Sequence, residues 1–127
     1  MKKILILVIS IVAIISCSKD DNDKTARVMI RLSNVSQYNF QNIIVNTSTG
    51  RVNFNNLTSG QKTPYKDFEK AYSYAFVELE INGKTYTIQP IDWDTESLSA
   101  NRYYTYQIDA NDSQNQYTRL SLSLIEE

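Results

Sequence analysis

The stretch Tyr72–Gln89, YSYAFVELEINGKTYTIQ, decides which class of fold the chain adopts. Asn82-Gly83 separates two arms rich in β-branched and aromatic residues, and this combination is the strongest short-range signal for a β-hairpin with a two-residue turn. The turn pairs Ile81 with Lys84, Glu80 with Thr85, Leu79 with Tyr86, Glu78 with Thr87 and Val77 with Ile88. One face of the hairpin is then apolar and the other polar, so turn chemistry and hydrophobic pattern indicate the same register.

Short stretches on both sides of the hairpin alternate between apolar and polar residues, which is the pattern of half-buried strands. They predict strands over Arg27–Ser33, Tyr38–Thr47, Arg51–Asn55, Arg102–Asp109 and Tyr117–Ile125. The side chains expected to point inward are Val28, Ile30, Leu32, Val52, Phe54, Tyr104, Tyr106, Ile108, Leu120, Leu122 and Leu124. Arg119 falls on the opposite, polar side of the last strand. The continuous triplet Ile43-Ile44-Val45 indicates burial on both faces or a β-bulge.

Two segments between these strands, Asn56–Lys70 and Pro90–Asn101, lack the alternation and are predicted loops. The apolar side chains of the first segment that are expected to anchor it beneath the sheets are Leu57, Tyr65 and Phe68. A short helical turn over Asp67–Ala71 is one interpretation of its end. Because loops on a rigid β-scaffold often carry binding residues, we expect ligand contacts in these two segments.

Seven strands within residues 25–127 predict a single all-β domain, an antiparallel β-sandwich. Leu98 lies six residues before Tyr104, at the start of a strand. This spacing resembles the tyrosine corner of immunoglobulin-like and fibronectin type III domains, in which the tyrosine hydroxyl bonds back to nearby backbone. The resemblance implies an immunoglobulin-like sandwich. The Pro and Gly often seen between these positions are absent, so a transthyretin-like arrangement of the same strands is equally allowed.

The first sixteen residues have the pattern of a secretory signal peptide. Lys2-Lys3 is followed by an apolar run, Ile4–Ile15, that only Ser10 interrupts. A basic start and an apolar core of about 7–15 residues are typical of such signals. A membrane-spanning helix needs about 20 apolar residues, so this run is too short to be one. An uncleaved signal anchor is the alternative.

Ile14-Ile15-Ser16-Cys17 resembles the lipobox of bacterial lipoproteins, with an aliphatic residue, a small residue and then cysteine. The resemblance implies cleavage before Cys17, a diacylglyceryl group on its sulfur and acylation of the new amino group. Two or more acyl chains anchor a protein stably in a membrane, whereas one does not. This covalent lipid is the only cofactor expected. An ordinary signal peptide with an incidental cysteine is the alternative.

Residues 17–24 form a short polar tether after the predicted cleavage site. Lys19, Asp20 and Asp21 resemble the export signal of surface-displayed lipoproteins in Bacteroidota. The resemblance implies that the domain faces the outside of the outer membrane. A charge cluster is more generally a solvated linker, and the alternative location is therefore the periplasmic leaflet.

The composition argues against several classes of function. The chain has no His, and its single Cys is the predicted lipidation site, so no Cys/His zinc site or His general base is expected. Loss of residues 1–16 removes Lys2 and Lys3 and leaves 11 basic residues against 14 acidic ones, a net charge near −3. A nucleic-acid partner is therefore not expected. No carboxylate pair or Gly-rich phosphate loop stands out, so we expect no enzyme and no catalytic residues.

Asp92, Asp94 and Glu96 alternate around Trp93 in the second predicted loop. Oxygen ligands at such spacing suit calcium, but the Gly and the distal Glu of an EF-hand loop are missing. We therefore favour a solvated acidic loop, with Trp93 packed over the end of the sandwich, and expect no metal. These four residues remain candidates for ligand contact.

Tyr72 and Tyr74 fall on the strand face that carries Glu78 and Glu80, so part of these aromatic side chains is expected to be exposed. An exposed aromatic surface indicates contact with a protein or with the apolar face of a sugar. The expected function is a binding or adhesion module on a lipid-anchored outer-membrane protein, with an unidentified protein or glycan partner. The alternatives are a structural accessory subunit of an envelope assembly and a glycan-binding module.

Overall fold

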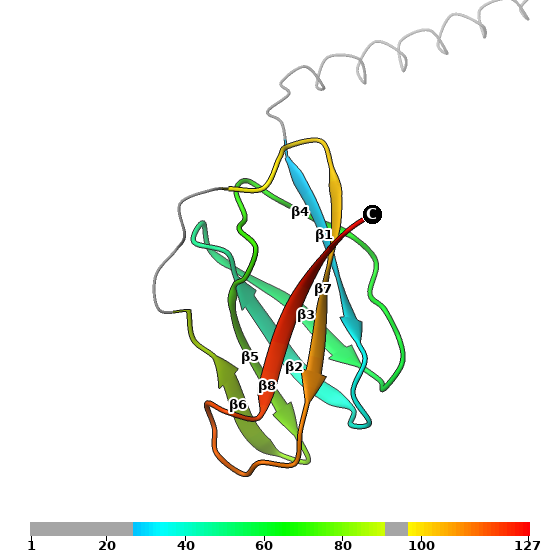
Figure 1. The fold of residues 1–127 in the computed structure, drawn as a ribbon, viewed down its shortest axis with the longest axis vertical. Coiled ribbons are helices and arrows are strands. Elements are labelled where there is room, and N and C mark those ends of the chain that lie inside the picture. Colours follow the sequence, from blue (N-terminus) through cyan, green and yellow to red (C-terminus); the bar gives the residue numbers. More distant parts are fainter. Residues whose placement is uncertain (1–26, 91–96) are drawn as a thin grey trace, which may run out of the picture.

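A computed structural model describes residues 27–90 and 97–127, and these form two four-stranded sheets packed face to face (Figure 1). The strands are β1 (Val28–Asn34), β2 (Phe40–Asn46), β3 (Arg51–Leu57), β4 (Lys66–Phe68), β5 (Phe76–Ile81), β6 (Lys84–Ile88), β7 (Tyr103–Ala110) and β8 (Leu120–Glu126). One sheet has the order β4-β1-β7-β8 and the other the order β3-β2-β5-β6. The expected all-β sandwich is confirmed, with one strand more than expected.

The strand order distinguishes between the two topologies left open by the sequence. The first two strands of an immunoglobulin domain pair within one sheet. Here β1 and β2 lie in opposite sheets, and β1 pairs with β7 in parallel, whereas all other pairs are antiparallel. This order is not that of an immunoglobulin domain, which leaves the transthyretin-like alternative. The tyrosine corner is nevertheless present, because the Tyr104 hydroxyl accepts a 3.1 Å hydrogen bond from the Ser99 backbone N–H.

Four connections gather at one end of the sandwich, which we call the distal end. It consists of residues 35–39, 58–65, 82–83 and 111–119. In Figure 1 this end lies at the bottom, whereas β1 begins at the top. The distal end is therefore the end farthest from the point where the N-terminal segment enters the domain.

The β5–β6 hairpin has the register expected from its turn, from Ile81↔Lys84 to Val77↔Ile88. The φ angles of Asn82 and Gly83 are 53° and 81°, as a type I′ turn requires at both central positions. β5 begins at Phe76 and not at the expected Tyr72, because the chain bends over residues 73–74 before it enters the sheet.

β2 contains the expected bulge. The pairing register shifts between Phe40 and Ile43 and again between Ile43 and Ile44, and Asn42 adopts a φ of 51°. Ile43 and Val45 are then both fully buried, while Ile44 is only half-buried. The bulge lets Phe40 and Ile43, three positions apart, both point into the core, and the triplet itself then alternates with Ile44 partly exposed.

The helical turn expected over Asp67–Ala71 is wrong, because this part of the chain contains β4. Phe68 pairs with Val28 and Lys66 with Ile30 along the edge of β1. The unpaired backbone groups of this edge are hydrogen-bond partners that no local sequence pattern reveals. Leu57 and Phe68 are buried anchors as expected, whereas Tyr65 is only half-buried and contacts the partly exposed Arg31 and Tyr103.

The core residues within the described part of the chain run from Val28 to Leu120. Tyr86 and Tyr106 are its largest fully buried side chains. The Tyr106 hydroxyl donates a 2.7 Å hydrogen bond to the Tyr72 carbonyl, and burial raises the pKa of this hydroxyl well above its usual range. The described residues therefore form an apolar core among themselves.

Candidate functional site

A buried arginine at the distal end is the centre of the candidate site. Arg119 immediately precedes β8 and is only 6% exposed, so the expectation that it faces solvent is wrong. Its Cζ lies 4.5 Å from the ring centroid of Tyr38 and 4.8 Å from that of Tyr86. Its Nη1 donates hydrogen bonds to the Tyr86 hydroxyl (3.0 Å) and to the Ser113 carbonyl (3.3 Å). Cation–π contacts and these two hydrogen bonds hold the guanidinium in place.

Arg119 differs from the other arginines of the described residues in having no carboxylate partner. The arginines that form ion pairs are Arg27 with Asp67, Arg31 with Glu127, Arg51 with Glu78 and Arg102 with Glu126. Within the same residues the buried Nε of Arg119 has no hydrogen-bond partner at all. A buried charge is costly unless it is paired and hydrogen-bonded. The guanidinium is therefore a positive charge that nothing in the described chain neutralises.

A cavity of about 250 Å³ opens beside this guanidinium. Its walls are formed by Ile81, Asn82, Lys84, Tyr86, Gln114 and Arg119. The Lys84 Nζ lies 6.0 Å from the Tyr86 ring centroid and 3.5 Å from the Gln114 carbonyl oxygen. Two cations and two side-chain amides line the cavity, and no carboxylate is among its described lining residues. The pocket is thus electropositive and rich in hydrogen-bond donors, which suits a polar anion.

The loop of residues 111–119 forms one wall of this pocket and is ordered by its own side chains. Asn111 Oδ1 accepts the Ser113 N–H, and Asn115 Oδ1 accepts the Tyr117 N–H, both at 2.8 Å. The Gln116 carbonyl accepts the Thr87 N–H at 2.9 Å, which ties the loop to β6. Such asparagine turns replace the backbone pairing that a loop lacks.

A second network holds Tyr38 against Arg119. Asn34 is fully buried, and its Nδ2 donates to the carbonyls of Tyr38 (2.8 Å) and Leu57 (3.0 Å). Its Oδ1 accepts hydrogen bonds from the backbone N–H and the hydroxyl of Ser36. Asn34 therefore fixes the β1–β2 connection, and with it the aromatic ring that covers one side of the guanidinium.

Most of the site residues expected from the sequence lie outside the described part of the chain. These are Cys17, Lys19, Asp20, Asp21, Asp92, Trp93, Asp94 and Glu96. Tyr72 and Tyr74 are described and half-buried, but they lie in the bend before β5, not on the strand. Neither lines the Arg119 pocket.

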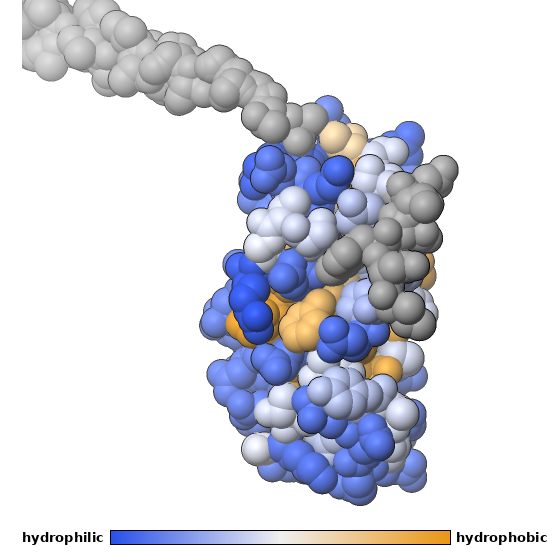
Figure 2. Space-filling model, turned by 90° about the vertical axis from the view of Figure 1, so that its left-hand side faces the viewer, coloured by the Kyte–Doolittle hydropathy of each residue, from blue (hydrophilic) through white to orange (hydrophobic). Residues whose placement is uncertain are grey.

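Tyr74 contributes to a different, apolar hollow between β6 and β8. This hollow has a volume of about 300 Å³ and is lined by Tyr74, Ile88, Gln89, Pro90 and Leu122. Figure 2 shows the side of the molecule that lies on the left in Figure 1, with an apolar patch surrounded by hydrophilic surface. Tyr74 is half-buried, as expected for a partly exposed side chain.

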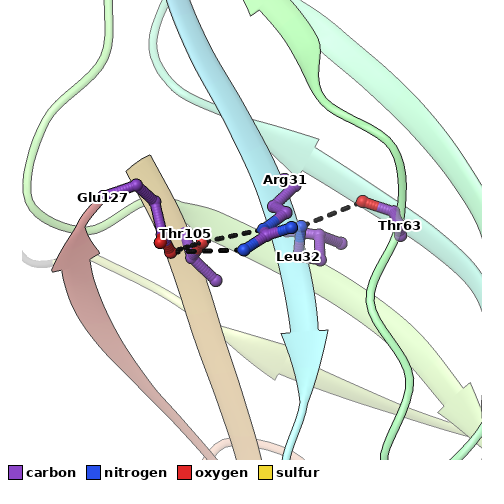
Figure 3. A network of polar contacts seen from close by, with 5 residues as sticks. All are labelled: Arg31, Leu32, Thr63, Thr105 and Glu127. Carbon is purple, nitrogen blue, oxygen red and sulfur yellow. Dashed lines mark hydrogen bonds and ion pairs between the residues drawn. The ribbon is translucent and has the colours of Figure 1, made fainter. Parts of the chain in front are cut away.

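Figure 3 shows a third polar cluster, on the outer face of the β4-β1-β7-β8 sheet. The Arg31 Nε donates to Thr105 Oγ1 at 3.1 Å, and its Nη2 lies 3.5 Å from Glu127 Oε2. The Thr105 hydroxyl also donates to Glu127, and this hydrogen bond, followed by the charge of Arg31, lowers the pKa of the Glu127 carboxyl. This cluster is neutralised internally, so it offers no open charge.

The described residues contain no group of three His, Cys, Asp or Glu side chains arranged to hold a metal ion. They also include no helix with the length and hydropathy needed to cross a bilayer.

No protein-family model matches the chain, and no curated protein matches its sequence. The fold is similar to a solved structure described as the NMR structure of the protein from Eubacterium rectale, with a TM-score of 0.53 and 16% sequence identity. The similarity covers 83% of this chain and 93% of that one. At this identity the likeness shows the fold alone, a β-sandwich.

Sequence reasoning missed the Arg119 pocket because its parts are far apart in the chain. Lys84 and Tyr86 belong to the hairpin, Tyr38 to the β1–β2 connection and Gln114 to the β7–β8 loop. The one signal available was the dense Asn, Gln and Ser content of residues 111–116, which predicts a structured turn but no burial of Arg119.

Proposed function

We propose that the chain is a non-enzymatic binding module, anchored to the outer membrane through lipid on Cys17 and displayed at the cell surface. The observation that carries the binding role is Arg119, a buried guanidinium without a carboxylate, which borders an open polar pocket. Burial of a guanidinium without a counter-ion lowers the stability of the fold. Residues that lower stability are usually found in binding sites.

The position of the pocket supports display. The lipid would hold the chain at its N-terminal end, and the pocket lies at the distal end, opposite the start of β1 (Figure 1). The ligand would then be reached from outside the cell without rotation of the domain.

The membrane location is tested by fractionation of cells that carry Cys17→Ala. Acylation requires the cysteine sulfur, so this variant is expected to leave the membrane fraction while its domain still folds, since the core lies between Val28 and Leu120. A variant that stays with the membrane would contradict the lipid anchor.

Surface display is tested by protease treatment of intact cells. The wild type is expected to be cleaved, and a triple variant with Lys19, Asp20 and Asp21 replaced by Ala is expected to be protected. Cleavage of neither would place the domain in the periplasm and contradict surface display.

The binding role is tested with a soluble chain of residues 18–127 applied to immobilised cell-surface glycans and proteins. Arg119→Met combined with Lys84→Gln removes both cations of the pocket and is expected to abolish retention. Lys70→Gln, which removes an exposed charge beside the end of β4 near the start of β1, is the matched control. Equal retention of all three chains would show that the pocket is not the contact, and no retention of any would remove the binding role.

A second candidate function, an accessory subunit of an envelope assembly, is supported by the apolar hollow between β6 and β8. Sedimentation distinguishes the two candidates. A strictly monomeric domain that does not associate with envelope proteins would count against the subunit.

A further inference from the structure

We infer that the Arg119 pocket binds the carboxylate of an acidic sugar. This inference rests on the proposed binding function and specifies its ligand. Three features carry it: a guanidinium edge without a hydrogen-bond partner, a second cation that lines the same cavity, and amide side chains around a space with room for one sugar ring.

The unpaired edge of the guanidinium is the first feature. Nη1 of Arg119 is occupied by the Tyr86 hydroxyl and the Ser113 carbonyl. Among the described residues no hydrogen bond is made by the buried Nε, and none is recorded for Nη2. Nε and Nη2 form one edge of the guanidinium, and their two parallel N–H groups match the two oxygens of a carboxylate. Nε is closed off from solvent, so a carboxylate reaches this edge only if the adjoining wall of the pocket shifts. It then satisfies the unpaired donor and neutralises the buried charge.

Lys84 supplies the second feature. Its ammonium group lines the same cavity and lies in the distal turn region, held near the Gln114 carbonyl. Its side chain is exposed, so it remains free to move toward a ligand. A single carboxylate between a fixed guanidinium and a mobile ammonium gains Coulomb attraction from both cations.

The walls of the pocket provide the third feature. Asn82 and Gln114 present amides that donate and accept hydrogen bonds, which suits the hydroxyl groups of a sugar better than the oxygens of a second anionic group. The cavity of about 250 Å³ has room for one ring rather than an extended chain. These features favour a sugar acid over inorganic phosphate.

The test is an NMR titration of the chain of residues 18–127 with glucuronate, monitored at the Nε–Hε resonance of Arg119. Glucuronamide, the neutral analogue, is the matched control for charge, and acetate is the matched control for the ring. Glucuronate is expected to shift this resonance and to bind roughly tenfold or more tightly than glucuronamide, since charge-assisted hydrogen bonds are lost in the amide. Acetate is expected to bind more weakly than glucuronate.

Two variants locate the effect. Lys84→Gln, at an exposed position, is expected to weaken glucuronate binding without loss of the folded spectrum, and Arg119→Lys is expected to abolish it although the charge is retained. Lys70→Gln is expected to bind as the wild type does.

The results that would contradict this inference can be told apart from one another. Equal affinity for acetate, phosphate and glucuronate would show a general anion site and overturn the sugar assignment. Absence of any shift at millimolar glucuronate would overturn the inference as a whole. If glucuronate does not bind but the chain is still retained on cell-surface material through the pocket, the proposed binding function stands without the sugar acid. If neither glucuronate binding nor retention is found, the proposed binding function is contradicted too.

Discussion

Arg31 and Arg119 make the same contact with tyrosine but differ in how their charge is met. The Cζ of each lies 4.8 Å from a tyrosine ring centroid, that of Tyr65 for Arg31 and that of Tyr86 for Arg119. Arg31 lies on the outer face of a sheet with a 24% exposed side chain, and Glu127 and Thr105 neutralise and fix it (Figure 3). Arg119 is 6% exposed and has no such partner within the described residues.

The presence of a carboxylate beside Arg31 and not beside Arg119 is the opposite of what burial alone would favour. The more deeply buried charge needs a counter-ion most, because the cost of desolvation grows as water is removed. In this molecule the exposed arginine has the carboxylate and the buried one has a pocket. We interpret the Arg31 cluster as a structural ion pair and the Arg119 site as a place prepared for a charge from outside. Four substitutions test this contrast.

Tyr86→Ala is expected to have the largest effect. The substitution removes a fully buried ring from the core and, with its hydroxyl, the hydrogen-bond acceptor of Arg119. The free energy of unfolding should fall by about 3–5 kcal/mol. Tyr65→Ala removes the half-buried ring beside Arg31 and is expected to lower the free energy of unfolding by about 1 kcal/mol. Denaturant unfolding of both variants measures the difference. Equal costs would mean that the two arginine–tyrosine contacts play the same structural role.

Gly83→Val disturbs the turn that presents Asn82 and Lys84 to the pocket. Gly83 has a φ of 81°, a conformation that a β-branched residue adopts only with strain, so we expect a cost of about 1–3 kcal/mol. No neighbouring atom blocks a Cβ at this position, so the cost arises from the backbone alone. Thr85→Val adds the same side chain within β6 and serves as the control. An unchanged melting temperature for Gly83→Val would contradict the type I′ turn.

Arg119→Met is expected to change the free energy of unfolding by less than about 1 kcal/mol. The lost cation–π contacts are offset by removal of a buried, unpaired charge. Glucuronate should raise the melting temperature of the wild type and of Arg31→Met, since a ligand that binds only the native state stabilises it. It should leave Arg119→Met unaffected. If Arg31→Met is the variant that loses this response, the assignment of the two arginines is reversed.

Glu127→Gln is expected to have the smallest effect, and one that depends on pH. The folded-state pKa of Glu127 lies below its ordinary value of 4.5, chiefly because the Thr105 hydroxyl donates to the carboxylate. The stabilisation of the folded state by the Glu127 carboxylate is therefore present above pH 4.5 and is lost as the pH falls through the lowered pKa. The variant should be less stable than the wild type at pH 7, and the two should converge in acid. Glu69→Gln, at an exposed carboxylate, is the control for the charge change, and a constant difference at all pH values would contradict the linkage.

The features predicted correctly are those that neighbouring residues specify. The hairpin register follows from Asn82-Gly83 and from alternation within the two arms, because the turn and the pattern act over a few residues. A bulge in β2 was one of the two outcomes that the apolar triplet indicated, and its register shifts lie between Phe40 and Ile44. The hydrogen bond between Tyr104 and Ser99 closes over five residues, which is why the tyrosine corner could be expected from spacing alone.

The features that the sequence did not reveal depend on pairings across long separations. The parallel pairing of β1 with β7 joins residues more than 70 positions apart, and β4 becomes a strand only because the edge of β1 is free to accept it. No local signal reports either pairing. The same limit applies to the order of the sheets, which distinguishes the transthyretin-like arrangement from the immunoglobulin-like one.

The sequence by itself determined the β-sandwich class, every described strand except β4 and most of the core, because alternation and turn chemistry are local properties. It also carries the pattern of a lipid-anchored, exported protein in its first 24 residues, which remains a prediction. Only the tertiary structure decided the fate of Arg119. Alternation places it on the polar side of its strand, but Tyr38, Tyr86 and the 111–119 loop close around it from three separate parts of the chain. Burial is a property of the whole packed molecule, so a residue that looks solvent-exposed in one strand became the centre of the candidate site.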